Sequence, residues 1–105
     1  MDNYLFKITY RLRAHDMERF EEILTGEIIP LAGELGLNLK GVWRSFVGNA
    51  GEYVELWEFD SIQQFETDWN KLINHPKLQD IFKTTGPMVE EEKSSLYQPV
   101  WKNPE

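Results

Sequence analysis

The chain has 105 residues, of which 41% are hydrophobic and 28% are charged, and its formal net charge at pH 7 is −7. A chain of this length buries roughly 60–70% of its unfolded surface on folding, so we expect a single domain over residues 1–105 with one compact core. The scattered positions of the 11 basic residues argue against nucleic acid as a partner, and the absence of cysteine excludes disulfides and thiolate metal sites.

The first predicted elements are a strand and a helix. Residues 4–12 alternate in polarity, which predicts a strand with Tyr4, Phe6, Ile8, Tyr10 and Leu12 on its core face. A helical stripe follows, formed by Met17, Phe20, Leu24, Ile28 and Leu31. We expect Asp16 to cap the start of this helix and Gly36 to close its end. Because Pro30 cannot donate to the carbonyl of Gly26, a kink or break is expected there.

A β-hairpin is predicted next. Residues 39–47 and 52–59 are rich in Val, Trp, Phe and Tyr, and they flank a short loop at residues 48–51. A four-residue loop sets the register and, with it, the face of each side chain. That register pairs Val47 with Glu52, Phe46 with Tyr53, Arg44 with Glu55 and Val42 with Trp57.

The C-terminal part is predicted to hold two helices and a strand. Ser61 and Gln64 form a capping-box signature, and the apolar stripe that follows predicts a helix; the stripe is Ile62, Phe65, Trp69, Leu72 and Ile73. Pro76 is expected at the first position of a further short helix. Residues 90–100 predict a final strand, and the run Glu90 to Glu92 is typical of a solvated strand edge.

The order β-α-β-β-α-β indicates an α+β, ferredoxin-like fold, in which a four-stranded antiparallel sheet carries two helices on one face. Two helices cover only one face of such a sheet. The hairpin nevertheless places apolar side chains on both faces, and each buried aromatic removes ~150–250 Å² from water. We therefore expect the second face to pack against a second copy of the chain about a two-fold axis.

No targeting or membrane segment is expected. No apolar run approaches the ~20 residues that a membrane-spanning helix needs, and the N-terminus begins directly with strand-like alternation instead of the layout of a signal peptide. We expect a soluble, unprocessed, cytoplasmic protein without a membrane partner.

Three segments resemble the NIPSNAP family, within the dimeric α+β barrel superfamily. They are TYRL (residues 9–12), ELWEFDSIQQF (residues 55–65) and LINHPKLQDIF (residues 72–82). The resemblance spans about residues 4–98. It implies that two sheets form a barrel across a homodimer and that each subunit has a cavity between its sheet and its helices.

Candidate ligand-binding residues come from the hairpin and the neighbouring elements. Arg44 and Glu55, opposed in the predicted register, would orient a polar ligand group or form a simple cross-strand ion pair. Four aromatic residues would line a pocket or fill the core: Tyr10, Trp43, Trp57 and Trp69. No catalytic residue is assigned.

No metal or cofactor is expected. The only histidines, His15 and His75, precede a helix cap and a proline, where capping or surface roles are typical, and no pair of them has metal-ligand spacing. The resemblance extends to haem-degrading enzymes, but KLQDIFK carries no histidine at the position where those relatives ligate haem iron.

The sequence leaves three functions open. The first is a homodimer of unassigned activity that binds a small hydrophobic molecule in the cavity. The second is a cofactor-free monooxygenase or isomerase acting on a hydrophobic cyclic compound, and the third is a scaffold. A shared fold does not choose among them.

Overall fold

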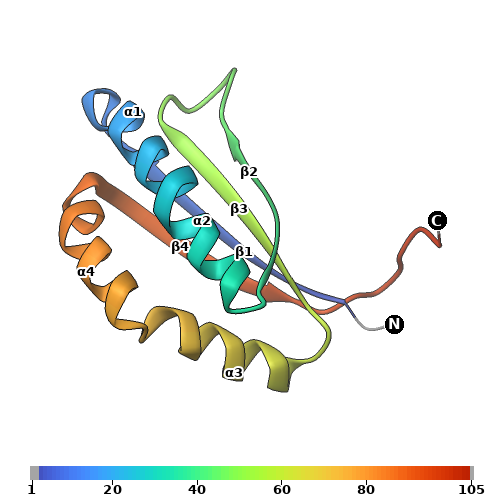
Figure 1. The fold of residues 1–105 in the computed structure, drawn as a ribbon. Helices are drawn as coiled ribbons and strands as arrows, with labels where there is room; N and C mark the ends of the chain where they lie inside the picture. The colour runs from blue at the N-terminus through green and yellow to red at the C-terminus, as the bar shows by residue number, and fades with distance from the viewer. Residues whose placement is uncertain (1–2, 105) are drawn as a thin grey trace.

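A computed structural model of the chain describes residues 3–104. Four strands form one sheet in the order β2-β3-β1-β4, and all paired neighbours are antiparallel. The helices lie against one face of this sheet (Figure 1), which confirms the α+β, ferredoxin-like fold. The elements in chain order are β1 (Tyr4–Leu12), α1 (Ala14–Ile23), the π-helix η1 (Leu24–Ile28), α2 (Ile29–Glu34), β2 (Asn38–Arg44), β3 (Glu52–Phe59), α3 (Ile62–Ile73), α4 (Pro76–Thr85), the 3-10 turn η2 (Gly86–Met88) and β4 (Val89–Tyr97).

Alternation along the two central strands builds the core. In β1 every second side chain from Phe6 to Leu12 is buried, and in β3 every second one from Tyr53 to Phe59 is buried. Since β1 and β3 are antiparallel neighbours with Phe6 opposite Trp57 and Tyr10 opposite Tyr53, these side chains share the face that the helices cover. The predicted core face of the first strand is confirmed, except that Tyr4 at its end is only half-buried.

The first helix begins earlier than predicted. Arg13 is its N-cap residue and makes no side-chain capping bond, so the predicted cap at Asp16 is wrong. Asp16 lies in the first turn instead, where a carboxylate interacts favourably with the helix dipole and resembles a cap in sequence. Gly36 has a φ of +85° just after α2 and closes the helix as predicted.

Of the kink or break predicted at Pro30, the break does not occur, and a π-helical turn precedes the proline instead. The N–H of Ile29 donates to the carbonyl of Leu24, five residues back, and the chain stays helical from Ala14 to Glu34. Pro30, which has no N–H to donate, follows this turn as the second residue of α2. The helix thereby keeps its contact with the sheet across the proline.

The hairpin register differs from the prediction by two residues. Strand β2 ends at Arg44, so the loop covers residues 45–51 and is longer than predicted, and Arg44 pairs with Tyr53 while Val42 pairs with Glu55. A shift by two keeps every side chain on its face, but Arg44 and Glu55 are not opposed. A bulge between Leu39 and Gly41 changes the register again. Phe46 and Val47 lie in the loop, 100% and 86% exposed.

The C-terminal helices are confirmed, and the strand predicted over residues 90–100 is found at Val89–Tyr97. Ser61 caps α3 by accepting from the N–H of Gln64, and the Gln64 side chain accepts in return from the N–H of Asp60. His75 caps α4, with Pro76 at the first helical position. Strand β4 pairs with β1 and is exposed along most of its length, including the run Glu90 to Glu92.

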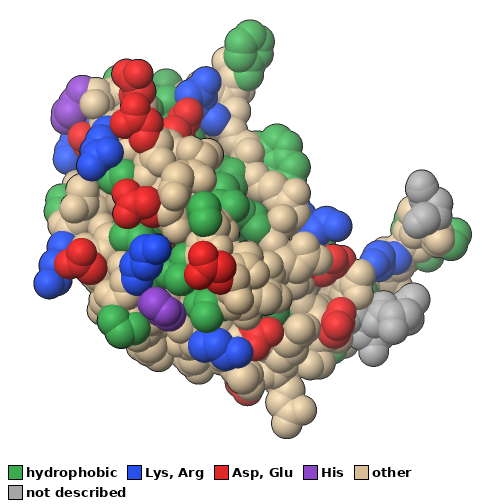
Figure 2. Space-filling model, viewed as in Figure 1, with side chains coloured by type: hydrophobic (Ala, Val, Ile, Leu, Met, Phe, Trp, Pro, Cys, Tyr) green, Lys and Arg blue, Asp and Glu red, His purple; other side chains and the backbone are tan. Residues whose placement is uncertain are grey.

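The face of the sheet opposite the helices mixes apolar and charged side chains. The register places Leu5, Val54 and Leu56 together with Trp43 and Tyr97 on this outer face. Trp43 is 53% exposed and Tyr97 is 49% exposed. On the helix-bearing side, basic, acidic and hydrophobic side chains are also interspersed (Figure 2). Among residues 3–104, no helix is long and apolar enough to cross a membrane.

Candidate functional site

A groove of about 400 Å³ lies between the edge strand β2 and the first helical segment. Its apolar wall includes Leu24 from η1, Val42 from β2 and Phe46 from the loop after β2. Leu24 is buried, Val42 is half-buried and Phe46 is fully exposed, so the groove runs from the edge of the core to solvent.

The π-helical turn forms part of this groove. Leu24 and Thr25, its first two residues, both line the groove. The hydroxyl of Thr25 donates to the backbone carbonyl of Glu21, 2.8 Å away, which fixes that side chain against its own helix. Single π turns within α-helices are frequent at functional sites.

One end of the groove is polar. Oε2 of Glu21 accepts hydrogen bonds from Nη1 of Arg44 at 2.6 Å and from the hydroxyl of Tyr53 at 2.5 Å. Burial, with the hydrogen bond to Glu21, raises the pKa of Tyr53 to about 12, so the phenol stays protonated and donates. The Arg44 side chain is 54% exposed and Glu21 is 38% exposed, so both charges are accessible from the groove.

A second polar cluster lies inside the core. The hydroxyl of Tyr10 donates to Oε2 of Glu55 at 2.6 Å, and Nε1–H of Trp57 donates to Oε1 at 3.0 Å. Glu55 is 8% exposed, and burial raises its pKa. Burial, followed by the charge of Glu55, also raises the pKa of Tyr10. Among the described residues, no basic side chain bonds this carboxylate. Hydrogen bonds from two neutral donors therefore replace the hydration that the carboxylate loses on burial.

Wild-type protein is expected to lose stability relative to Glu55→Gln as the pH rises above 4.5, the ordinary pKa of this carboxyl. Because the pKa of Glu55 is higher in the folded state than in the unfolded state, its contribution to the free energy of unfolding is full at low pH. That contribution is lost as the pH rises through the folded-state pKa. Glutamine keeps an acceptor for Trp57 and does not titrate. Urea unfolding of both proteins from about pH 4 to about pH 8 measures the difference. Parallel pH profiles would contradict the expectation.

The structure divides the predicted site residues among three places. Tyr10, Glu55 and Trp57 meet in the core, and Trp69 packs edge-on against Trp57 with ring centroids 5.2 Å apart. Trp43 lies on the outer face by its register and is also among the residues that line the groove. The predicted pairing of Arg44 with Glu55 is wrong, because the longer loop moves Arg44 opposite Tyr53 and its charge partner is Glu21.

Sequence reasoning missed Glu21, Leu24 and Tyr53 as residues of the groove. Glu21 lies 23 residues from Arg44 and 32 from Tyr53 in the chain, so no local motif joins them. Tyr53 also stacks on Tyr10, with ring centroids 5.5 Å apart and planes 4° from parallel. The groove and the core cluster therefore share a wall made of two tyrosines.

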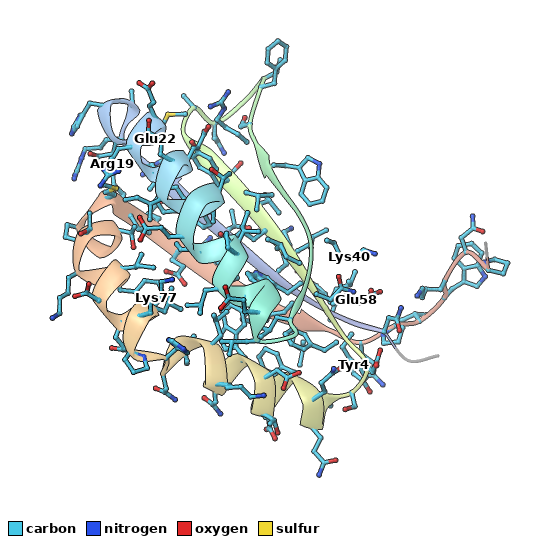
Figure 3. The ribbon with its side chains drawn as sticks, viewed as in Figure 1. Tyr4, Arg19, Glu22, Lys40, Glu58 and Lys77 are labelled. Atoms are coloured by element: carbon cyan, nitrogen blue, oxygen red, sulfur yellow. The ribbon has the colours of Figure 1, made fainter. Side chains whose placement is uncertain are left out.

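Glu58 and His75 have structural partners. Glu58 accepts from Asn3 at 2.6 Å and from Asn38 at 2.9 Å and pairs with Lys40 at 3.7 Å; Figure 3 labels Lys40 and Glu58 at this end of the sheet. Nδ1 of His75 accepts from the N–H of Lys77, which is a capping role. Over the described part of the chain, no group of three or more His, Asp or Glu residues is placed to hold a metal ion.

Comparison with known proteins identifies similar folds. The NIPSNAP family model matches residues 5–102, and no curated protein gives a significant match. A NIPSNAP family protein of unknown function from Agrobacterium tumefaciens superposes with a TM-score of 0.86 at 21% identity, covering 97% of this chain and 92% of that one. A NIPSNAP domain protein from Burkholderia xenovorans gives 0.86 at 22%, covering 97% and 99%. A Nitrosomonas europaea protein provisionally named an antibiotic biosynthesis monooxygenase gives 0.73 at 13%, covering 94% and 91%.

Proposed function

The chain belongs to the NIPSNAP family, and on that premise we propose that it is a homodimer that binds a small hydrophobic molecule in the groove between β2 and the first helical segment. The observation that carries the proposal is the groove itself. Its volume of about 400 Å³ falls within the ~300–1,000 Å³ typical of small-molecule sites.

The composition of the groove supports a ligand with a large apolar part. Leu24, Val42 and Phe46 supply apolar surface, and the polar groups gather around the Glu21 carboxylate. A mainly apolar lining with a few convergent polar groups is the usual design of a site that both binds and orients a small molecule. The fully exposed ring of Phe46 gives such a ligand an aromatic surface to cover.

The core cluster favours a second candidate, a cofactor-free monooxygenase or isomerase acting on a hydrophobic cyclic compound. A buried carboxyl with a raised pKa, held by a tyrosine and a tryptophan, is the type of group that exchanges protons with a substrate. The similarity in fold to the Nitrosomonas protein is in line with this candidate. Access of a substrate to Glu55, now 8% exposed, would require the helices to move away from the sheet.

The homodimer is supported by the outer face. Leu5, Val54 and Leu56 lie there with two half-exposed aromatic rings, and within residues 3–104 no helix covers them. A two-fold axis would bury this face against its own copy, because the same patch is then self-complementary. Because Trp43 lies on this face and also lines the groove, the proposed interface borders the groove.

We expect wild-type protein to bind N-phenyl-1-naphthylamine, a neutral apolar fluorophore, and Thr25→Trp to weaken that binding at least ~10-fold. The indole would fill the groove from the exposed Thr25 position of η1. A ~10-fold rise in the dissociation constant corresponds to a loss of about 1.4 kcal/mol of binding free energy. Fluorescence titration provides the dissociation constants.

The matched control is Thr67→Trp, an exposed threonine on α3 that does not line the groove. It should bind the fluorophore like wild type. Absence of binding to wild type, or equal binding by Thr25→Trp, would remove the groove as the site.

A further inference from the structure

Both donors at the polar end of the groove converge on a single oxygen. Arg44 and Tyr53 each bond Oε2 of Glu21, whereas Oε1 accepts no hydrogen bond from any residue in the described range 3–104. An ionised carboxylate has about four lone-pair positions, and a guanidinium has five N–H donors. The groove therefore offers one open acceptor oxygen beside a guanidinium with donors to spare.

The two charges at this end balance each other. Arg44 and Glu21 form one ion pair with an N–O distance of 2.6 Å, so a ligand with only a negative charge meets Glu21 and a ligand with only a positive charge meets Arg44. The chain as a whole, at −7, adds to the cost of binding an anion. A ligand that carries an ammonium group and a carboxylate on neighbouring carbons avoids each repulsion.

Resting on the proposed function, we infer that the ligand is a small zwitterion with an apolar body, of the class of apolar α-amino acids. Its carboxylate pairs with the guanidinium of Arg44, a geometry that allows two parallel hydrogen bonds. Its ammonium group donates to Oε1 of Glu21. Its side chain lies against Leu24, Val42 and Phe46.

The existing ion pair is no obstacle to this arrangement. Both side chains are partly exposed, and ion pairs at such positions contribute little to stability, so the guanidinium turns toward a ligand at small cost. Tyr53, only 2% exposed, keeps its bond to Oε2 and holds the Glu21 carboxylate in place. Glu21 and Tyr53 thus form the fixed part of the site, and Arg44 forms the movable part.

Displacement of the naphthylamine fluorophore by four single-ring compounds tests the inference. L-phenylalanine carries both charges, 3-phenylpropanoate lacks the ammonium, 2-phenylethylamine lacks the carboxylate, and ethylbenzene lacks both. L-phenylalanine is expected to bind at least ~10-fold more tightly than each of the other three, with an affinity that falls as salt is added because the charges are exposed.

Two variants and one control test which residues cause the tighter binding of L-phenylalanine. Arg44→Gln should lower phenylalanine affinity to that of phenylethylamine, and Glu21→Gln should lower it to that of phenylpropanoate. Arg19→Gln removes a comparable exposed ion pair on α1, with Glu22 at 3.7 Å (Figure 3), and should change nothing.

Each outcome has a separate meaning. Equal affinity of the four compounds, or fluorophore binding that phenylalanine does not displace, would overturn the zwitterion inference and leave the groove as an apolar site. Failure of the fluorophore itself to bind wild type would overturn the proposed function together with this inference.

Discussion

Replacement of Trp57 by alanine is expected to lower the free energy of unfolding by ~3–5 kcal/mol, the range for truncating a buried aromatic residue. Trp57 is 1% exposed and lies at the centre of the core. Its loss leaves a cavity beside Trp69, whose ring packs edge-on against it at 5.2 Å. It also removes the Nε1–H donor from Glu55, a buried carboxylate that would keep only the Tyr10 hydroxyl.

Urea denaturation measures the change in the free energy of unfolding, and three further variants serve as comparisons. Trp57→Phe keeps most of the ring volume and removes the donor, so it should cost less than Trp57→Ala. Trp69→Ala is expected to cost a similar ~3–5 kcal/mol, because its ring also packs against Phe6 at 4.9 Å. Phe82→Ala, at an exposed position of α4, is the control and should stay within ~0.5 kcal/mol of wild type. Near-wild-type stability of Trp57→Ala would refute its role in the core.

The second large effect is expected at the proposed dimer interface. Leu56→Arg should convert a particle of twice the 12.4 kDa chain mass into a single-chain particle at micromolar concentration. Leu56 lies between Gly41 and Lys7 on the outer face, and a two-fold axis would bring two new guanidinium groups into one apolar interface. Charges facing each other in this way cost several kcal/mol.

Sedimentation velocity distinguishes the two particles. Phe82→Arg provides the matched control, because it adds the same charge at an exposed position of α4 on the other side of the molecule, and it should sediment like wild type. Wild-type protein that is well folded and sediments as a single chain would refute the homodimer, whatever the variant does.

Local sequence patterns predict only part of the candidate site. Arg44 lies on a strand as predicted and lines the groove, but a four-residue loop would pair it with Glu55, whereas the structure pairs it with Tyr53. The real loop is longer, since Phe46 and Val47 leave the strand. Glu21 had no pattern of its own, because its role depends on a helix turn lying next to two strands that come later in the chain.

The sequence by itself determined the elements, the faces of the strands and hence the ferredoxin-like order, because alternation, helical spacing and capping residues act over a few neighbouring positions. Tertiary structure alone decided the hairpin register, the π-helical turn before Pro30 and the meeting of Glu21, Arg44 and Tyr53. These features depend on packing between segments far apart in the chain. In particular, the helix continues through Pro30 since its contact with the sheet outweighs the local preference to break.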